Sequence, residues 1–196
     1  MHDARVREAM AIVPRALFVD PELAGRADED GPLPIGEGQT ISQPLVVALM
    51  AQALELGSDD RVLEVGAGSG YAAAVLARLA ARVDAIEVRD ALARRAAENL
   101  ARAGVANVHV HAGDGTAGWP PGAPYDAISI AAGGPALPPA LIEQLAPGGR
   151  LVMPLGPEPN RQRLVRVRRG PGGAERVEDL GVPVRFVPLV SPQSPG

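Results

Sequence analysis

From Arg61 to Leu155, short apolar runs alternate with helical stretches, and this alternation constrains the fold more than any other feature of the chain. The runs typical of strands are RVLEV, VDAIEV, NVHVHA, YDAISI and RLVMPL, and the helical stretches among them are YAAAVLARLAA, ALARRAAENLARAG and PPALIEQLAPGG. Strands joined through helices lie parallel, because each crossover returns the chain to the same edge of the sheet. The sequence therefore predicts an α/β fold with a doubly wound, mostly parallel sheet and helices on both faces.

Segments with other patterns flank this region. Residues 4–13 have apolar side chains at helical spacing before Pro14, and a second helix is predicted from Pro44 up to Gly57. Between them, residues 32–44 (PLPIGEGQTISQP) are expected to form an ordered loop. After the parallel strands, RQRLVRVRRG and RVEDLGVPVRFVPL are separated by the turn-like GPGGAE, which predicts an antiparallel hairpin at the C-terminal edge of the sheet.

The length of 196 residues suits a single domain. We expect this domain to span residues 1–190 and to be followed by a disordered tail over residues 191–196. Its expected parts, in order, are N-terminal helices with an active-site loop, a cofactor-binding core and C-terminal strands, over residues 1–57, 58–156 and 157–190.

Composition excludes several kinds of chemistry. All 19 basic residues are Arg and the chain has no Cys, so a Schiff-base or P-loop lysine, thiolate catalysis, disulfides and cysteine zinc sites are ruled out. A net charge of −4 with dispersed arginines disfavours nucleic-acid binding. The N-terminus lacks a signal-peptide pattern and no apolar run is long enough to span a bilayer. We therefore expect a cytoplasmic protein without membrane attachment.

A glycine-rich segment from Glu64 to Gly70 (EVGAGSG) follows the first predicted parallel strand and precedes a helix. Glycines there let the backbone turn tightly and let a ligand approach closely. A dinucleotide fingerprint would have its third Gly at the place occupied by Tyr71. The spacing instead resembles the acidic-G-x-G-x-G arrangement of Rossmann-like methyltransferases that use S-adenosylmethionine.

Two further carboxylates follow the next strands. Glu87 ends the second predicted strand, where it can accept hydrogen bonds from both hydroxyls of a ribose, and Asp114 ends the third, where it suits an adenine amino group. Because the carboxyl ends of parallel strands meet at one crevice, both side chains are expected near the glycine segment. Alternatively, each carboxylate only caps a helix.

The segment PLPIGEGQTISQP is more specific than the glycines. Together with AMAIVPRALFV, GDGTAGWPPGAPYDAISIAA, LIEQLAPGGRLVMPLG and VRFVPL, it closely resembles the protein-L-isoaspartate O-methyltransferase family, from about Val6 to Leu189. The resemblance implies methyl transfer from S-adenosylmethionine, with S-adenosylhomocysteine as product. The acceptor it implies is the free α-carboxylate of L-isoaspartyl residues in damaged peptides and proteins. The methyl ester would then collapse to a succinimide, which hydrolyses partly to normal aspartate.

The resemblance also implies roles for individual residues. It places the family's active-site residue at Ser42, on a loop that acts as a lid, with Thr40, Ile41 and Ala131 on the substrate side. It implies no metal, and we expect the enzyme to be a monomer. Together with the strand-end residues above, the expected cofactor-binding residues are Gln43, Glu64, Val65, Gly66, Gly68, Ser69, Gly70, Glu87, Val88, Asp114 and Gly115.

The implied chemistry needs no general base. A carboxylate with a reference pKa of about 3.5 to 4.3 is already ionised at neutral pH, so catalysis consists of aligning it with the S–CH3 bond and excluding water. The Ser42 hydroxyl can orient that carboxylate without shielding its charge. Helix capping is an alternative role: with Pro44 as the first helical residue the cap would be Gln43, a poor cap, so a shifted register would make Ser42 the cap.

Histidine and tryptophan side chains are weaker candidates. His109 and His111 alternate on one predicted strand and so face the same side, but without a third ligand they do not predict a metal site. Trp119 could stack on a ligand, although an anchor for its proline-rich loop is the favoured interpretation.

Arginines near the C-terminus have two interpretations. Arg166, Arg168 and Arg169 are expected on the edge hairpin, where charges discourage pairing with another sheet. Arg185, beside Phe186, could bind an anionic substrate or could be a surface charge.

Three positions depart from the family pattern. Ala16 stands where a His is usual, Asp28 stands where an aromatic residue is usual, and Ile130 to Gly134, which includes Gly133, replaces a TAAA-like segment. These departures bear on peptide recognition more than on methyl transfer. Three readings therefore stay open: a repair enzyme for isoaspartyl peptides, a carboxylate O-methyltransferase for a dedicated peptide or small acid, and a non-catalytic protein that binds S-adenosylmethionine.

Overall fold

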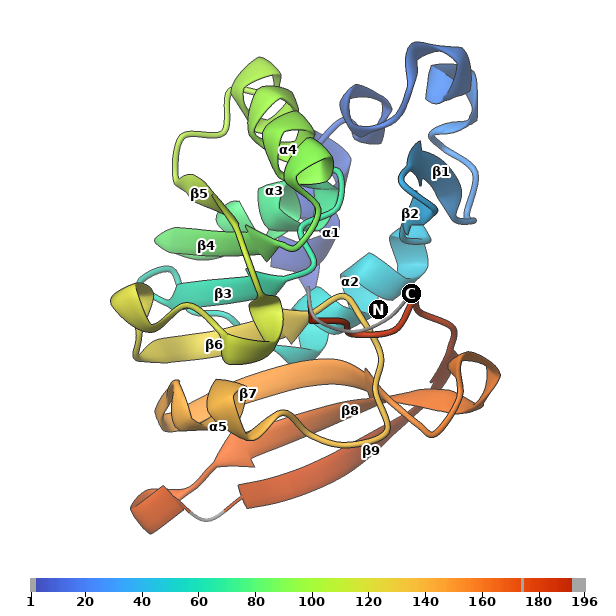
Figure 1. Cartoon of the computed structure of the whole chain (residues 1–196). Coiled ribbons are helices and arrows are strands. Elements are labelled where there is room, and N and C mark those ends of the chain that lie inside the picture. Colours follow the sequence, from blue (N-terminus) through green and yellow to red (C-terminus); the bar gives the residue numbers. More distant parts are fainter. Residues whose placement is uncertain (1–2, 174, 192–196) are drawn as a thin grey trace.

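A computed structural model describes residues 3–173 and 175–191 of the chain. Its main feature is a seven-stranded sheet in the order β5-β4-β3-β6-β7-β8-β9 (Figure 1). Neighbouring strands from β5 to β7 are parallel, and β8 and β9 continue the sheet antiparallel. The strands are β3 Arg61–Val65, β4 Arg82–Glu87, β5 Val108–Ala112, β6 Tyr125–Ile130, β7 Leu145–Leu155, β8 Gln162–Arg169 and β9 Glu175–Val184. The predicted doubly wound sheet with an antiparallel C-terminal edge is confirmed.

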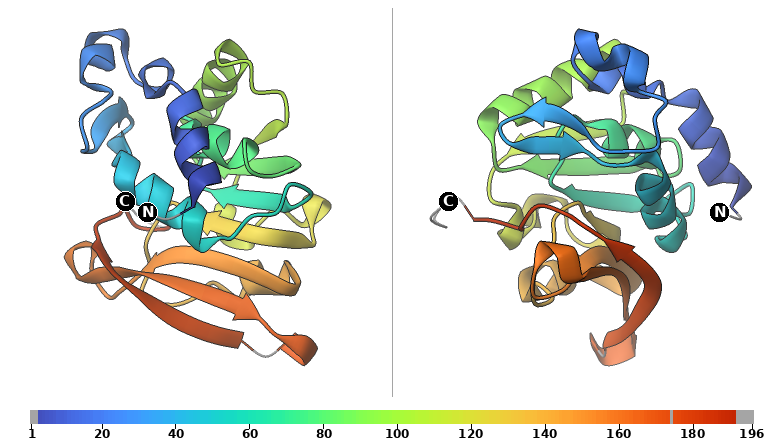
Figure 2. Two further views of the ribbon diagram at one scale, coloured as in Figure 1. Left: turned by 180° about the vertical axis from the view of Figure 1, so that it is seen from behind. Right: turned by 90° about the vertical axis from the view of Figure 1, so that its right-hand side faces the viewer.

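Helices cover both faces of the sheet, as predicted, but unequally (Figure 2). Four helices pack on one face, and α5 with short 3-10 turns covers the other. The α-helices are α1 Ala4–Ile12, α2 Pro44–Ala53, α3 Tyr71–Ala77, α4 Asp90–Arg102 and α5 Pro139–Glu143. The 3-10 turns are η1 Arg15–Phe18, η2 Pro21–Arg26, η3 Gly115–Ala117, η4 Pro120–Gly122, η5 Pro159–Arg161 and η6 Pro171–Gly173.

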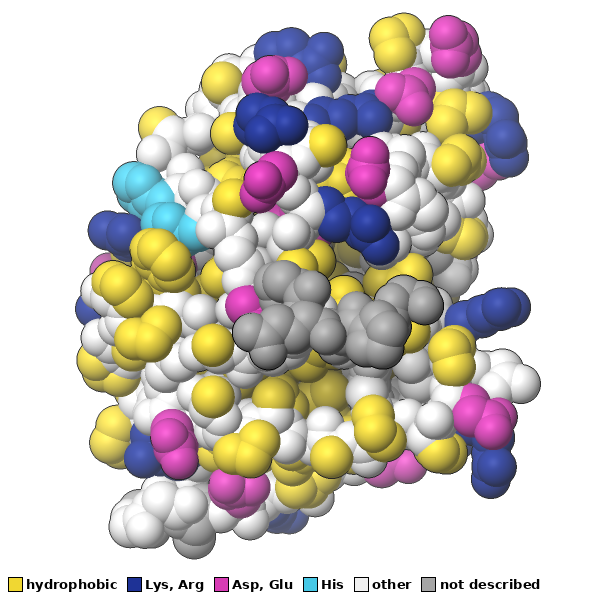
Figure 3. Space-filling model, viewed as in Figure 1, with side chains coloured by type: hydrophobic (Ala, Val, Ile, Leu, Met, Phe, Trp, Pro, Cys, Tyr) yellow, Lys and Arg dark blue, Asp and Glu magenta, His cyan; other side chains and the backbone are white. Residues whose placement is uncertain are grey.

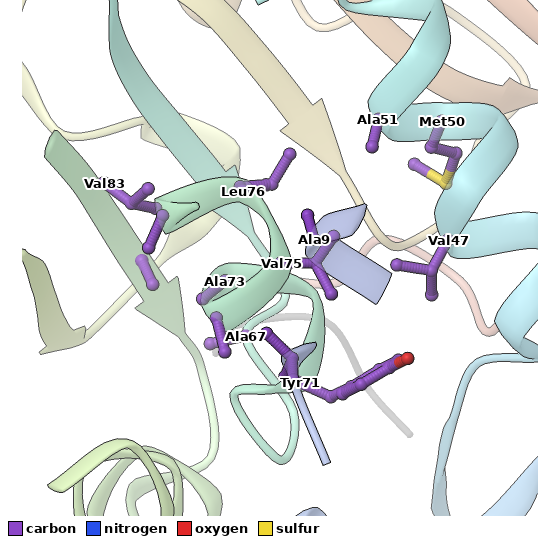
Figure 4. Packing of buried hydrophobic residues seen from close by; sticks show 14 of the residues in the cluster. Ala9, Val47, Met50, Ala51, Ala67, Tyr71, Ala73, Val75, Leu76 and Val83 are labelled. Atoms are coloured by element: carbon purple, nitrogen blue, oxygen red, sulfur yellow. The ribbon is translucent and has the colours of Figure 1, made fainter. Parts of the chain in front are cut away.

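The larger core lies between this sheet face and the first helices (Figure 4). Ala9 of α1, Val47 of α2 and Val75 of α3 belong to one buried cluster, which also includes Val83 of β4. Small alanine side chains on α3, such as the fully buried Ala73, let this helix lie close to the strands. The site described below is therefore carried by a sheet and helices that are closely packed.

Residues 32–44 form more regular structure than predicted. The expected ordered loop is a two-stranded antiparallel hairpin of β1 (Leu33–Gly36) and β2 (Gln39–Ile41). Pro34 pairs with Thr40 inside it. A two-stranded hairpin has only edge strands, and an edge strand tolerates a proline that cannot donate a hydrogen bond. The proline and glycine content that suggested a loop is therefore compatible with strands here.

The helix predicted over PPALIEQLAPGG is also shorter than expected. The α5 helix ends at Glu143 and β7 begins at Leu145, so the glycines lie within a strand. Pro147 explains the early end, because a proline in a helix clashes with the carbonyl four residues before it, here that of Glu143.

The C-terminal arginines do not lie on the edge strand. β8 is paired on both sides, with β7 and β9, so the interpretation that Arg166, Arg168 and Arg169 discourage edge pairing is wrong. Arg166 and Arg168 instead form ion pairs with Glu55, at 2.5 and 2.7 Å, beyond the C-terminal end of α2. Arg169 donates to the carbonyl of Glu143.

The surface carries charged side chains of both signs and exposed hydrophobic side chains (Figure 3). On the face seen in Figure 3, acidic and basic side chains are interleaved, and hydrophobic side chains gather over the side of β6 and α5. None of the helices in the described part of the chain is long and apolar enough to cross a membrane. Of the predicted disordered tail, residues 192–196 lie outside the described residues, whereas Ser191 has a defined contact, described below.

A buried polar cluster joins β4 to β5. The carboxylate of Asp84 is fully buried and accepts a hydrogen bond from Arg82 at 2.9 Å, and the Nε2 atom of His111 lies 2.9 Å away. The ring of Trp119 stacks on His111 with centroids 4.0 Å apart, which supports its interpretation as a loop anchor. Burial raises the pKa of Asp84, but the hydrogen bonds from Arg82 and His111 outweigh it and hold that pKa below its usual value.

Replacing Asp84 by Asn should lower the free energy of unfolding by about 1.5 to 3 kcal/mol at neutral pH, because the substitution removes a buried carboxylate and its charge-assisted hydrogen bonds with Arg82 and His111. A depressed pKa stabilises the fold above the carboxyl's ordinary value of 3.8 and loses that contribution as the pH falls below it. Denaturant unfolding at about pH 7 and about pH 3 should therefore show a difference between wild type and variant that shrinks in acid.

Glu29→Gln is the matched control, since it removes the charge of a solvent-exposed ion pair with Arg26. It should leave the midpoint nearly unchanged. A difference for Asp84→Asn that is equally large at both pH values would contradict the assigned role of the ion pair.

Candidate active site

A cavity of about 300 Å³ opens at the carboxyl ends of β3 and β4. The strand order reverses here, because β4 and β5 extend the sheet on one side of β3 while β6 and β7 extend it on the other. Open α/β sheets bind ligands at such a reversal. The predicted site residues that line the cavity are Thr40, Ile41, Ser42, Glu64, Val65, Gly66, Gly68, Ser69, Glu87, Val88, Gly115 and Ala131.

The remaining three predicted residues do not line this cavity. Gly70 begins α3 with φ +88°, and a Cβ there would lie 3.2 Å from the carbonyl oxygen of Ala96 on α4. This glycine therefore lets α3 and α4 pack closely. Gln43 donates to Asp30 and lines a second cavity, and Asp114 has partners of its own.

Glu87 ties the glycine segment to the end of β4. Its Oε2 atom accepts from the backbone N–H of Gly68 at 2.8 Å, and Oε1 accepts from the N–H of Arg89 at 3.0 Å. The side chain is 6% exposed and faces the cavity. Because both oxygens are already oriented by the backbone, each presents its remaining lone pair in a defined direction. This arrangement suits recognition of two neighbouring hydroxyls.

Glu64 is the most unusual group in the cavity wall. It is fully buried, and neither of its carboxylate oxygens has a hydrogen-bond partner in the described structure. Burial, followed by the nearby charge of Glu87, raises the pKa of Glu64 to about 8. A buried carboxyl without a partner is costly for the fold, so its position indicates a ligand with a positive charge or a hydrogen-bond donor.

Asp114 is engaged by the protein itself. Its Oδ1 atom accepts from the backbone N–H of Thr116 at 2.9 Å and from the Thr116 hydroxyl at 2.6 Å, and its Oδ2 atom accepts from Ser191 at 2.8 Å. The capping alternative is thus realised for Asp114, which begins η3. Gly115, next to it, lines the cavity, and a Cβ there would lie 2.5 Å from Val65.

Ser42 lies where two cavities meet. A second cavity of about 520 Å³ shares Thr40, Ser42 and Ala131 with the first and extends toward Arg185. The capping alternative for Ser42 is wrong. Gln43 is the N-cap residue of α2, and its side chain makes no capping hydrogen bond. The helix N-terminus is satisfied instead by Asp30, which accepts from the N–H of Leu45 at 3.1 Å. The Ser42 side chain is therefore not needed as a cap.

The hairpin of β1 and β2 forms the roof of the first cavity. Arg95 of α4 donates to the carbonyl of Ile35 at 3.0 Å, which docks the hairpin on the helix layer. At the turn, the carboxylate of Glu37 lies 3.9 Å from Arg89, which lines the cavity below. The position of the hairpin is therefore consistent with the predicted lid.

One wall of the cavity was not predicted from the sequence. Val187 to Val190 close its side after β9, and Gly133 holds this segment by two backbone hydrogen bonds of 2.8 Å, to Val187 and from Leu189. The VRFVPL motif overlaps this segment and could have indicated it. Its contacts with the cavity come from long-range packing, which a local pattern does not reveal. Other lining residues that were not predicted are Gly38, Gln39, Val47, Ala67, Tyr71, Ala72, Ile86, Arg89 and Ala132.

Comparison with known proteins decides the family. A family sequence model described as protein-L-isoaspartate(D-aspartate) O-methyltransferase matches residues 1–194. The chain belongs to this family. The resemblance stated from PLPIGEGQTISQP and its companion motifs is therefore confirmed.

Individual members of the protein-L-isoaspartate O-methyltransferase family match over nearly the whole chain. The chain is 56% identical over 190 residues to protein-L-isoaspartate O-methyltransferase 1 of Rhodopseudomonas palustris (strain HaA2), covering 97% of this chain and 77% of that protein. It is 54% identical over 190 residues to the enzyme of Anaeromyxobacter dehalogenans (strain 2CP-1), covering 96% and 90%. A crystal structure from Plasmodium falciparum, reported in complex with S-adenosyl-L-homocysteine, has the same fold, with a TM-score of 0.82, 24% identity and coverage of 97% and 92%.

Glu64→Gln should stabilise the ligand-free methyltransferase in mild alkali. The wild-type carboxyl is neutral in the folded protein up to about pH 8 but ionises near 4.5 in the unfolded chain. A raised pKa therefore stabilises the fold fully below 4.5 and loses this contribution as the pH rises to about 8. The variant has no such loss, so its advantage should reach a few kcal/mol, on the order of 1.4 per unit of pKa difference.

Melting temperatures from about pH 4 to about pH 9 measure this effect. The exposed Glu37→Gln variant should follow the wild-type curve. If Glu64→Gln follows it as well, the buried carboxyl does not titrate in the assigned range.

Proposed function

We propose that this protein transfers a methyl group from S-adenosylmethionine to the free α-carboxylate of L-isoaspartyl residues in damaged proteins and peptides. The methyl ester then forms a succinimide, which begins repair. One observation carries the proposal: Ser42 and Thr40 lie at the junction of two cavities, so that each residue can contact ligands on both sides. The family membership supports the same reaction.

The first cavity fits the methyl donor. Its volume of about 300 Å³ is at the lower end of small-molecule pockets. Glu87 has oriented oxygens for ribose hydroxyls, and the unpartnered carboxyl of Glu64 can accept a hydrogen bond from the donor or ionise beside its positive charge. The donor supplies an electrophilic methyl group on its sulfonium. Asp114 lies next to Gly115, which lines the cavity, and we assign it to the adenine amino group. Its Oδ2 atom accepts from Ser191 and has a second lone pair for this hydrogen bond.

The second cavity fits an anionic acceptor. Among its lining residues Arg185 is the cation, and Asn160 adds a polar side chain. The acceptor carboxylate is ionised at neutral pH, so no proton has to be removed from it. The work of the protein is then to hold one carboxylate oxygen against the first cavity, which the Ser42 hydroxyl can do by donating a hydrogen bond, and to exclude water with the hairpin and the C-terminal segment.

Two of the three departures from the family pattern lie outside both cavities, whereas the third, Ile130 to Gly134, contributes Ala131 to both of them. Ala16 and Asp28 are exposed and do not line either one. Gly133 acts indirectly, since a Cβ there would lie 2.0 Å from the amide of Gln162, which in turn holds the backbone of Phe186. The departures at Ala16 and Asp28 therefore leave the lining of both cavities unchanged, which is compatible with an isoaspartyl acceptor.

The test of the function is methyl transfer from labelled donor to two matched peptides that differ only in isoaspartate or aspartate. We expect labelling of the isoaspartyl peptide and release of the methyl group as the succinimide forms. A parallel calorimetric titration measures donor binding. Labelling of neither peptide despite donor binding would contradict the repair function. An absence of donor binding would contradict any methyltransferase activity.

Two substitutions separate the roles of the cavities. Ser42→Ala should lower turnover on the order of 10- to 100-fold with little change in donor affinity, because only positioning is lost. Glu87→Ala should weaken donor binding by a similar factor, since it removes charge-assisted hydrogen bonds worth about 1.5 to 3 kcal/mol. Steady-state kinetics and calorimetry measure the two effects, with the exposed Ser58→Ala as control. Unchanged turnover of Ser42→Ala would remove Ser42 from the mechanism.

A further inference from the structure

Arg15 lies buried beneath the segment that carries Ser42, with 5% of its surface exposed. One terminal nitrogen, Nη1, donates to the carbonyls of Ala27 at 2.9 Å and Glu29 at 3.3 Å. The other, Nη2, donates to the carbonyls of Gly31 at 2.8 Å and Ser42 at 3.1 Å. One guanidinium therefore joins the turn before the hairpin to the residue after it.

The position of this guanidinium is tightly determined. Its Nε atom is buried without a partner, and its centre lies 6.0 Å from the ring centroid of Tyr71, which lines the first cavity. Tyr71 in turn packs edge-to-face on Phe18, with ring centroids 5.7 Å apart. Because the guanidinium is planar and rigid, its four hydrogen bonds fix the carbonyl of Ser42 relative to the turn over residues 27–31.

A second set of contacts holds the residues that follow Ser42. Asp30, within the turn that Arg15 binds, accepts from the side chain of Gln43 at 2.9 Å and from the N–H of Leu45 at 3.1 Å. The turn is therefore connected to this segment twice, to Ser42 through Arg15 and to Gln43 and Leu45 through Asp30. Without Arg15, the link through Asp30 reaches only the residues that follow Ser42.

We infer that Arg15 is a positioning residue for the methyl-transfer step, which it serves by fixing the backbone at Ser42 between the two cavities. This inference rests on the proposed function, because it takes Ser42 as the group that orients the acceptor carboxylate. Arg15 itself lines neither cavity. Its loss should therefore reduce the turnover number while leaving donor binding intact.

The experiment compares Arg15→Lys with Arg150→Lys. Arg150 also donates to backbone carbonyls, those of Leu54, Glu55 and Asp126, but none of these residues belongs to the hairpin or the Ser42 segment. A lysine keeps the charge and loses the planar fork in both cases. We expect Arg15→Lys to lower kcat by about 10- to 100-fold with donor Kd unchanged within about threefold, and Arg150→Lys to lower only the melting temperature.

Two further readouts test the placement of Ser42, and the second of them needs no acceptor. In Arg15→Ala, added guanidinium should restore part of the lost kcat without affecting the wild type. Amide hydrogen exchange of residues 39–43 should be faster in Arg15→Lys than in Arg150→Lys, and this readout needs no turnover. A wild type that is inactive on isoaspartyl peptides while exchange still responds as expected would overturn the proposed function and leave the placement by Arg15 supported.

The inference itself is overturned by any of three results. The first is an unchanged kcat together with unchanged exchange in Arg15→Lys. The second is a donor affinity that falls by the same factor as kcat. The third is failure of all Arg15 variants to fold where Arg150→Lys folds, since Arg15 would then serve the fold as a whole.

Discussion

The chain must turn from β3 into α3 within a few residues at the centre of the sheet, and this turn determines where every other part of the site can lie. Gly68 at the turn donates its N–H to Glu87 at the end of β4, so the turn and the neighbouring strand end form one unit. Ile35 of the hairpin lies against the same glycine, 3.3 Å from where a Cβ would be. A side chain at this position would strain the turn, because Gly68 has a φ of +54°, and the end of the Ile35 side chain would have to shift by a few tenths of an ångström.

Charge is distributed around the two cavities in a way that matches opposite ligands. The first cavity has two buried acidic side chains, Glu64 and Glu87, in its wall, and the second has Arg185. In the proposed reaction, the positive charge of the methyl donor interacts with Glu87 and favours the ionised form of Glu64, and the free carboxylate of the acceptor is attracted to Arg185. Because the net charge of the chain is −4, no broad field attracts an anionic acceptor, and the local arrangement has to do so.

The parallel core could be predicted because its signals are local. Apolar runs, glycine spacing and acidic residues at strand ends each depend on neighbouring positions, and Glu64, Gly66 and Glu87 indeed meet at one cavity. The hairpin at Pro34 was predicted as a loop because composition alone does not reveal whether a strand lies at an edge. The partners of Asp114 and Arg166 come from distant segments, Ser191 and Glu55, which no local pattern indicates.

The exclusive use of arginine has a structural counterpart in this fold. Arg15 and Arg150 each donate to three or more backbone carbonyls, and Arg5 donates to those of Leu56 and Leu79. A lysine ammonium donates three hydrogen bonds from a single nitrogen. A guanidinium donates from three separate nitrogens in one plane, so it can reach the carbonyls of different segments. Irregular segments, such as the turn before the hairpin, leave carbonyls that no helix or sheet can satisfy. Where such a segment also carries a residue proposed to orient the acceptor, as it does at Ser42, a buried arginine satisfies these carbonyls and fixes the backbone of that residue with the same hydrogen bonds.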